Sequence, residues 1–492
     1  MQPVYARLPN WLQPAAIWAY GWHLRRARYG GVYRTALGEF AERDGYSEER
    51  WREHQDAALK SLLRHAVTRV PFYRELHAAG RYPVEEVRSV ADLPVLPAIS
   101  KWEVYERPEA FLAEGVRRER LLAETTSGTT GTPLTLYVSR ETNQRWYAAT
   151  TRRMLQWQGV AEGLAHATFG ARPAVPLERE RPPYWRYNPV GKQLYVPVQH
   201  LTRTKLDAVL DALRRYRVRY LYGYGSSLGV LARHALETGR DDLHLDAAFS
   251  NAEPFFPRQR ERVERAFRCR TADTYAASEK TFACFEYERT LYASPDIGVL
   301  EILRDDEHDN GGSRVADPGE VGEVCGTGLL NWDFVLIRYR QGDRAALGPA
   351  PKTGPVRMPV VERIDGRNED ALITPEGREV RWAGIVFKTD MRILEAQVAQ
   401  VTPQIVEARV VPAEGYRDRE DGHLIRDELS RRLGPSMHVR VRCVPEIPRL
   451  ANGKFRTVLR ECEIPGAGSR KQQSQSTAAN ASPPSPAEAS SG

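Results

Sequence analysis

The sequence has few cysteines and no long apolar run. Only five of its 492 residues are cysteine, at positions 269, 284, 325, 443 and 462, and none forms a Cys-x-x-Cys pair. This small, odd number argues against a disulfide framework and favours free thiols in a reducing cytoplasm. No segment approaches the roughly 20 apolar residues of a transmembrane helix. We also expect no cleavable signal in residues 1–40, where Pro9 and Pro14 interrupt a short apolar stretch.

The charge balance is basic, with a net charge of +7 and a pI near 9.1. This favours an anionic substrate or cofactor. Nucleic acid is not expected, because no recognition motif is found. Aromatic residues between Trp11 and Trp22 precede Arg25, Arg26 and Arg28, a pattern that could contact an anionic membrane. We favour the alternative that this segment is a helix docked on the main domain.

The length and the order of elements indicate a multidomain α/β protein. A chain of 492 residues exceeds what one core usually holds. Helical and strand patterns alternate at residues 204–217, 219–222, 226–238, 247–250 and 257–267. This alternation predicts a parallel sheet covered on both faces. A smaller unit begins near residue 366, with its clearest predicted helix at 391–401. Residues 466–492 are rich in Ser, Ala, Gln and Pro, which predicts disorder.

A Ser/Thr/Gly loop, ETTSGTTGTP at residues 124–133, is the stretch of the chain that points most specifically to a function. Gly128 and Gly131 permit positive φ and a close backbone approach to a ligand. The hydroxyls around them and the inward-curling N–H groups suit a polyphosphate. A Walker loop would carry Gly-Lys-Ser/Thr and open into a helix, whereas a strand pattern follows here at residues 134–138. The alternative is an ordinary polar surface loop.

Four further segments carry polar side chains suited to a nucleotide. The carboxylate of Glu279 ends the segment 273–279 and could hold Mg²⁺ beside phosphates. Asp343, in the segment 337–344, could accept hydrogen bonds from a ribose diol. The segment 366–370 suits a hinge, with Arg367 near a phosphate. Lys454 is presented by an Asn-Gly turn. Each of these residues alone would be an ordinary surface residue, and only their order along the chain is specific.

That order resembles the adenylate-forming superfamily of acyl-CoA synthetases, luciferases and peptide-synthetase adenylation domains. Within it, the chain most resembles the phenylacetate–CoA ligase-like branch associated with capsular polysaccharide biosynthesis (CapK type). The resemblance covers roughly residues 20–460 and rests on these segments: TTSGTTGTP (125–133), NAEP (251–254), TYAASE (274–279), YRQGD (339–343), GRNED (366–370) and PRLANGK (448–454).

The resemblance implies a role for each matching residue. The phosphate loop would comprise Ser127, Gly128, Thr129, Thr130, Gly131 and Thr132. The rest of the nucleotide site would comprise Ala252, Glu253 and Pro254 beside adenine, Tyr275 stacked on it, Ser278, and Asp343 on the ribose. Catalysis would involve Lys454 between the carboxylate and the α-phosphate, Glu279 as the Mg²⁺ ligand, and Arg367. The acyl pocket would include Tyr224, Ser250, Ala276 and Ala277, and the hinge Glu369 and Asp370.

The resemblance also implies a domain plan and shows departures from the family pattern. We expect an N-terminal helical region at 1–100, a large AMP-binding domain at 101–366, a small mobile α+β domain at 367–465 and a disordered tail. Ala276 stands where glycine is usual, and Thr132 and Leu134 replace lysines common in the wider superfamily. Cys284 has no second cysteine or histidine nearby, so we expect no structural zinc.

The implied activity is ATP- and Mg²⁺-dependent adenylation of a carboxylic acid, followed by acyl transfer to CoA, a carrier-protein thiol or another nucleophile. One alternative is an adenylyltransferase that caps a hydroxyl-bearing acceptor with AMP. Another is a non-catalytic scaffold in polysaccharide assembly, which would be expected to lose Glu279, Asp343 or Lys454. All three are present. The acid and the final acceptor stay open.

Overall fold

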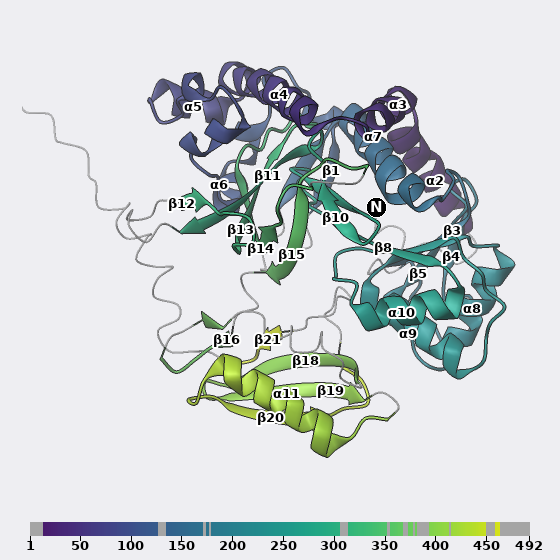
Figure 1. Cartoon of the computed structure of the whole chain (residues 1–492). Helices are drawn as coiled ribbons and strands as arrows, with labels where there is room; N and C mark the ends of the chain where they lie inside the picture. Colours follow the sequence, from purple (N-terminus) through teal and green to yellow (C-terminus); the bar gives the residue numbers. More distant parts are fainter. Residues whose placement is uncertain are drawn as a thin grey trace, which may run out of the picture. The chain divides into compact units, whose positions relative to one another are not determined.

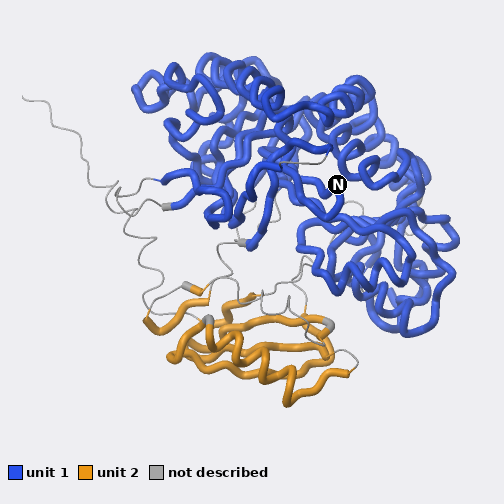
Figure 2. Tube along the Cα trace, viewed as in Figure 1, with its two compact units in different colours: residues 1–367, 449–455 blue, residues 368–448, 456–492 orange. Residues whose placement is uncertain are grey.

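The chain folds into a large mixed α/β unit and a small α+β unit, as predicted (Figure 2). The computed structural model describes residues 13–125, 134–170, 174–176, 179–305, 313–351, 355–367, 372–376, 379–380, 393–412, 415–448 and 458–462. Unit 1 comprises residues 1–367 and 449–455, and unit 2 comprises residues 368–448 and 456–492. Each unit has its own sheet and its own hydrophobic core.

A mixed sheet forms the centre of unit 1 (Figure 1). Its strands are β3 (His166–Gly170), β4 (Arg186–Asn188), β5 (Gln193–Pro197), β6 (Tyr220–Gly223), β7 (Ala247–Ser250), β8 (Arg270–Ala276), β9 (Ala283–Tyr287), β10 (Thr290–Ala293), β11 (Gly298–Asp305), β12 (Ser313–Val315), β13 (Gly322–Gly328), β14 (Tyr339–Leu347) and β15 (Val360–Arg367). Within the described residues their order is β12-β11-β13-β14-β15-β10-β9-β8-β7-β6-β3-β5-β4. The section from β5 to β8 is parallel, as predicted, and β8 to β12 pair antiparallel. A separate antiparallel hairpin joins β1 (Leu122–Thr125) to β2 (Thr135–Val138).

Helices surround this sheet. They are α2 (Gln13–Tyr29), α3 (Tyr33–Arg43), α4 (Glu48–Arg69), α5 (Pro71–Ala78), α6 (Lys101–Glu106), α7 (Arg140–Thr150), α8 (Leu206–Arg215), α9 (Gly225–Glu237) and α10 (Pro257–Phe267). Pro71 begins α5 because its ring fits the first helical turn. The Ser100 hydroxyl oxygen caps α6 by accepting a hydrogen bond from the backbone N–H of Glu103. A single π-helical turn, η5 (Thr151–Leu155), continues α7.

Both faces of the parallel section are buried, because successive side chains of a strand point to opposite faces. Leu221 and Ala248 pack into the cluster formed with α8, α9 and α10, which lie side by side (Figure 1). Their strand neighbours Tyr220, Ala247 and Phe249 pack instead against α3 and α7. The carboxyl ends of β6, β7 and β8 are therefore held between two helical layers.

Unit 2 consists of a four-stranded sheet, a short hairpin and one helix in its described part. The elements are β16 (Leu372–Ile373), β17 (Glu379–Val380), β18 (Ile393–Thr402), β19 (Ile405–Pro412), α11 (Asp418–Leu433), β20 (His438–Cys443) and β21 (Val458–Arg460). The sheet order is β20-β19-β18-β21. Ile425, Leu429 and Leu433 of α11 are fully buried in its core.

The predicted helix at residues 391–401 is wrong, because most of this segment forms β18. Its Leu, Glu, Ala and Gln residues have good intrinsic helix propensity. Antiparallel pairing with β19 and parallel pairing with β21 outweigh that preference. The helix of this unit is α11, whose buried residues recur at a spacing of four.

Candidate active site

The carboxyl ends of three parallel strands lie next to one another in unit 1. Gly223 of β6 pairs with Ser250 of β7, and Ser250 pairs with Asp273 of β8. Ligands of open α/β sheets bind outside such strand ends. The motif segments 251–254 and 274–279 therefore begin at neighbouring points of one sheet edge.

Hydrogen bonds fix the turn that follows β7. The Ser250 hydroxyl donates to the Glu253 carbonyl oxygen at 2.9 Å. The Thr274 hydroxyl donates to the Ser250 carbonyl oxygen, also at 2.9 Å. Ala252 adopts a φ of 58° and is exposed, as is Pro254. The fully buried Ser250 thus holds the turn, and the turn presents Ala252 and Pro254 outward.

The Glu253 carboxylate contacts the start of a helix. Its Oε2 accepts a hydrogen bond from the backbone N–H of Ser226 at 3.2 Å, in the first turn of α9. A carboxylate is stabilised there by unpaired N–H groups and by the positive end of the helix dipole. Gly225 permits this close approach, because a Cβ would lie 3.0 Å from the Pro254 carbonyl oxygen. Glu253 therefore positions the turn relative to α9.

Tyr275 and Asp343 connect two motif segments that lie far apart in the sequence. The Tyr275 hydroxyl of β8 donates to Asp343 Oδ2 of β14 at 3.0 Å. The ring of Tyr275 lies 5.1 Å from that of Phe282. The backbone of Asp343 pairs with that of Arg367, the last residue of β15. The structure therefore brings Tyr275 and Asp343 together and aligns the backbone of Arg367 with them.

A buried lysine ties the hairpin that carries the Ser/Thr/Gly loop to the end of β8. Lys280 Nζ lies 3.0 Å from Glu124 Oε2 in β1 and 4.7 Å from the ring centroid of Trp146. Its side chain is only 7% exposed, and its φ of 58° is unusual for a residue with a side chain. Sequence reasoning did not identify Lys280, since its position next to Glu279 was its only signal.

The acyl-pocket candidates and the Mg²⁺ candidate lie around the same strand ends. Tyr224 follows β6 directly and is buried. Ala277 is buried, whereas Ala276 and Ser278 are exposed and Glu279 is partly exposed. A partly exposed carboxylate such as that of Glu279 is a ligand type that Mg²⁺ accepts, since Mg²⁺ takes one or two carboxylates plus phosphate oxygens. Within the described ranges, no three His, Cys, Asp or Glu side chains are grouped to form a metal site by themselves.

Asp273 has an environment that the sequence did not predict. Its carboxylate accepts backbone hydrogen bonds from Phe255 at 3.1 Å and from Thr274 at 2.9 Å. Burial raises the pKa of Asp273 to about 7, and the nearby Glu286 carboxylate adds to the increase. The backbone hydrogen bonds and Arg260 oppose it. Asp273 thus links the turn after β7 to β8 through a carboxyl group that titrates near neutral pH.

Several candidate residues lie outside the described residues. They are Ser127, Gly128, Thr129, Thr130, Gly131, Thr132, Glu369, Asp370 and Lys454; of Arg367, the backbone is described and the side chain is not. The five cysteines, all described, are free thiols. In the same described part of the chain, no helix is long and apolar enough to cross a membrane.

Known proteins resemble the chain in sequence and in fold. Residues 372–461 match the CapK C-terminal domain. Protein CapK of Staphylococcus aureus is 24% identical over 415 residues, covering 82% of this chain and 88% of that protein. Phenylacetate–coenzyme A ligase of Thermus thermophilus is 24% identical over 467 residues, covering 84% and 96%.

Solved structures show the same fold. A 2-hydroxyisobutyryl-CoA ligase in complex with R3-HIB-AMP superposes with a TM-score of 0.65 at 17% identity, covering 89% of this chain and 94% of the ligase. In its C-terminal match and in its two relatives the chain is thus similar to CapK and to phenylacetate–CoA ligases, and in its fold it is similar to the solved ligase.

Proposed function

We propose that this protein uses ATP to adenylate a carboxylic acid and then transfers the acyl group to a thiol. The observation that carries the proposal is the hydrogen bond from Tyr275 to Asp343. It joins the segments 274–279 and 339–343, while the Thr274 hydroxyl joins the former to the Ser250 carbonyl oxygen, directly before the turn at 251–254. Three family motifs, dispersed over about a hundred residues of sequence, therefore share one hydrogen-bonded region.

Each side of this region has a role in nucleotide binding. Asp343 would accept hydrogen bonds from the ribose hydroxyls, with Arg367 beside it. Adenine would lie against Ala252 and Pro254, with the ring of Tyr275 on its other side. The loop from Ser127 to Thr132 would bind the β- and γ-phosphates. Lys280 supports this assignment, because its ion pair with Glu124 holds the strand that leads into the loop next to Glu279.

In the first step, a carboxylate oxygen of the acid attacks the α-phosphorus of ATP, and pyrophosphate leaves. The protein aligns the two anions and neutralises charge in the in-line transition state. Lys454 would contact both the carboxylate and the α-phosphate. Glu279 would hold Mg²⁺, which supplies positive charge to the polyphosphate when bound.

In the second step, a thiolate attacks the acyl carbon and AMP leaves. The relatives named phenylacetate–CoA ligases support CoA as the acceptor. The acyl group would enter between Tyr224, Ser250 and the Ala276–Ala277 pair, although the Ser250 hydroxyl is already engaged by Glu253. We also propose that unit 2 changes orientation between the steps about Glu369 and Asp370.

The test is ATP–pyrophosphate exchange across a set of carboxylic acids. We expect acid-dependent exchange in the wild-type protein and none in Lys454→Ala, because the substitution removes a contact made in the transition state. ATP binding by Lys454→Ala, measured by calorimetry, should stay nearly unchanged. Full exchange by a folded Lys454→Ala protein would contradict the assignment of Lys454.

The product of the reaction separates this function from adenylyl transfer. With ATP labelled in the α-phosphate, an acyl-CoA synthetase releases all label as free AMP. An adenylyltransferase would leave the label on a hydroxyl-bearing product and would need no carboxylic acid. A protein that binds ATP but catalyses neither reaction with any acid or acceptor would favour the scaffold role.

A further inference from the structure

The helix α2 is attached to unit 1 by one of its faces. Ile17 and Ala27 are buried on this inner face. Gly21 packs so closely on β4 that a Cβ would lie 2.2 Å from Oδ1 of Asn188. The side-chain amide of Asn143 in α7 donates to the Ala27 carbonyl oxygen at 2.8 Å. These contacts fix which residues of α2 point outward.

The outer face of α2 is aromatic and basic. Trp18 and Trp22 are 53% and 45% exposed, and their ring centroids lie 6.3 Å apart. Arg25 and Arg26 are also exposed, and the Arg25 guanidinium lies 5.5 Å from the Trp22 ring centroid. The spacing of four, seven and eight residues from Trp18 places all four on one side of a helix.

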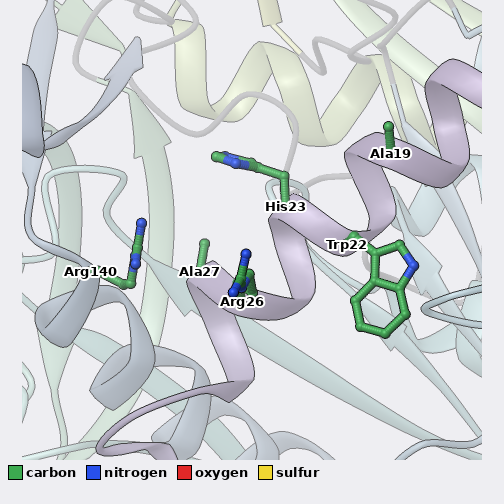
Figure 3. Close-up of a pocket in the computed structure, with 6 residues that line it drawn as sticks. All are labelled: Ala19, Trp22, His23, Arg26, Ala27 and Arg140. Carbon is green, nitrogen blue, oxygen red and sulfur yellow. The ribbon is translucent and has the colours of Figure 1, made fainter.

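Positive charge dominates the surroundings of this face. Residues 1–38 include five arginines and no aspartate or glutamate. Where the structure is described, no carboxylate lies within ion-pair distance of Arg25, Arg26 or Arg140. Arg26 and His23 project from α2, and Arg140 projects from the start of α7 (Figure 3). Together with Ala19, Trp22 and Ala27 they line a hollow of about 510 Å³.

We propose that the outer face of α2 binds the surface of an anionic lipid bilayer. Indole rings favour the headgroup region, where the ring is shielded and its N–H stays hydrated. Arginines beside them are attracted to anionic lipids, and the hollow between α2 and α7 offers the guanidinium groups of Arg26 and Arg140 to a headgroup phosphate. Because α2 is docked on the body of unit 1, binding would hold unit 1 in a defined orientation on the membrane.

A second exposed aromatic pair, in α6, shows that exposed aromatic rings alone do not predict binding to an anionic membrane. Trp102 and Tyr105 of α6 are 55% and 43% exposed, and their rings stack at 5.4 Å. In the same short helix Glu103 and Glu106 outweigh Lys101, so its charge is negative. An anionic surface would repel that helix. The two aromatic pairs therefore have matched exposure and opposite local charge, which makes the α6 pair a control.

The test is co-sedimentation with lipid vesicles. The probes are vesicles of phosphatidylcholine alone and vesicles in which phosphatidylglycerol supplies negative charge. We expect binding to the anionic vesicles only, decreasing as salt screens the arginines. The variant Arg25→Gln/Arg26→Gln should bind roughly 30-fold more weakly, because each basic residue near an anionic surface contributes about fivefold. Trp18→Ala/Trp22→Ala should also bind more weakly.

The control variants are Trp102→Ala/Tyr105→Ala and Arg64→Gln/Arg81→Gln, which remove exposed side chains elsewhere in unit 1. Both should bind as the wild-type protein does, and all variants should keep their melting temperature and pyrophosphate exchange. Equal binding to neutral and anionic vesicles, or equal loss in the controls, would overturn the proposal. Gel filtration showing a dimer that depends on Trp18 and Trp22, without vesicle binding, would overturn it as well.

Discussion

The Tyr275 hydroxyl donates a hydrogen bond of 3.0 Å to Asp343 Oδ2, across 68 residues of sequence. The acceptor oxygen belongs to the carboxylate that we assign to the ribose hydroxyls. A carboxylate fixed by one donor keeps its remaining lone pairs in a defined direction. In the proposed complex Tyr275 would have two tasks, since its ring would border adenine while its hydroxyl donates to Asp343.

Tyr275→Phe keeps the ring and removes only the hydroxyl. We expect the KM for ATP in pyrophosphate exchange to increase roughly tenfold, because a hydrogen bond to a charged group contributes about 1.5–3 kcal/mol. The kcat should change much less. The variant should also discriminate less between ATP and 2′-deoxy-ATP.

A second site variant and a control variant test the effect of Tyr275→Phe on the KM for ATP. Asp343→Asn should raise the KM for ATP at least as much as Tyr275→Phe. Tyr292→Phe removes a hydroxyl from β10, where the ring packs on Trp157, and should change neither parameter. Unchanged discrimination against 2′-deoxy-ATP in both site variants would show that Asp343 does not contact the ribose.

Lys280 and Glu124 should act as a unit. Lys280→Met and Glu124→Gln each break the ion pair between the end of β8 and the strand entering the phosphate loop. We expect each to lower kcat/KM for ATP about tenfold, and the double variant to lose little more than either single one, because coupled residues are non-additive. The kcat/KM for ATP of all three variants is measured by ATP–pyrophosphate exchange.

The matched control for this cycle is Lys205→Met. Lys205 is partly buried, and like Lys280 it lies over an aromatic ring, that of Tyr184 at 5.0 Å, while it donates to the Arg179 carbonyl oxygen. The Lys205→Met variant should leave the rate of ATP–pyrophosphate exchange unchanged. A loss in Lys280→Met far exceeding that in Glu124→Gln would mean that Lys280 contacts the nucleotide directly and is not a positioning residue.

Local patterns predicted the alternating helices and strands between residues 204 and 267. The helix predicted at residues 257–267 has the same bounds as α10. Tyr275 and Asp343 were found from motif order, but their hydrogen bond joins β8 and β14, which are not neighbours in the sheet, and no local pattern encodes such a contact. The ion pair of Lys280 is a contact over 156 residues and was missed for the same reason. In unit 2, strand pairing outweighed the helix propensity of β18.

Asp273 should make the stability of unit 1 depend on pH. Burial raises its pKa from about 3.8 to about 7 in the folded state. The folded protein therefore binds this proton more tightly than the unfolded chain does, and the contribution of Asp273 to stability is greatest below about pH 4. The free energy of unfolding should fall as the pH rises through about 7, by at most about 4 kcal/mol. Urea unfolding at several pH values measures this contribution.

Asp273→Asn removes the titrating carboxyl group but keeps a side chain of nearly the same shape. Its stability should change less with pH between about 4 and 7 than that of the wild-type protein. Asp242→Asn is the comparison, because Arg240 lowers the pKa of Asp242 and this exposed group contributes in the opposite direction. Parallel pH profiles of the wild-type protein and Asp273→Asn would refute the contribution of Asp273.

Arg153 and Asp296 form the most deeply buried ion pair of the described residues. The guanidinium donates to both carboxylate oxygens at 2.6 and 3.0 Å, and both side chains are 0% exposed. The π-helical turn η5 places Arg152 and Arg153 so that both donate to Asp44, at 2.7 and 2.9 Å. This cluster ties α3 to η5 and to the turn before β11.

Removing one charge of this pair should destabilise unit 1 strongly. Asp296→Asn keeps the shape of the side chain but leaves the Arg153 charge buried with less compensation, and the expected loss is about 3–5 kcal/mol. Glu75→Gln breaks the ion pair of Glu75 with Arg107, whose side chains are 54% and 53% exposed, and its loss should be below about 1 kcal/mol. Urea unfolding followed by tryptophan fluorescence compares the two variants.

Similar small losses in both variants would mean that neighbouring groups, including Arg43 at 3.6 Å from Asp296, compensate fully for the missing charge. In that case the packing of Phe40 and Trp51 around the Arg153 guanidinium would hold this part of the fold, and Trp51→Ala should destabilise it more than Asp296→Asn.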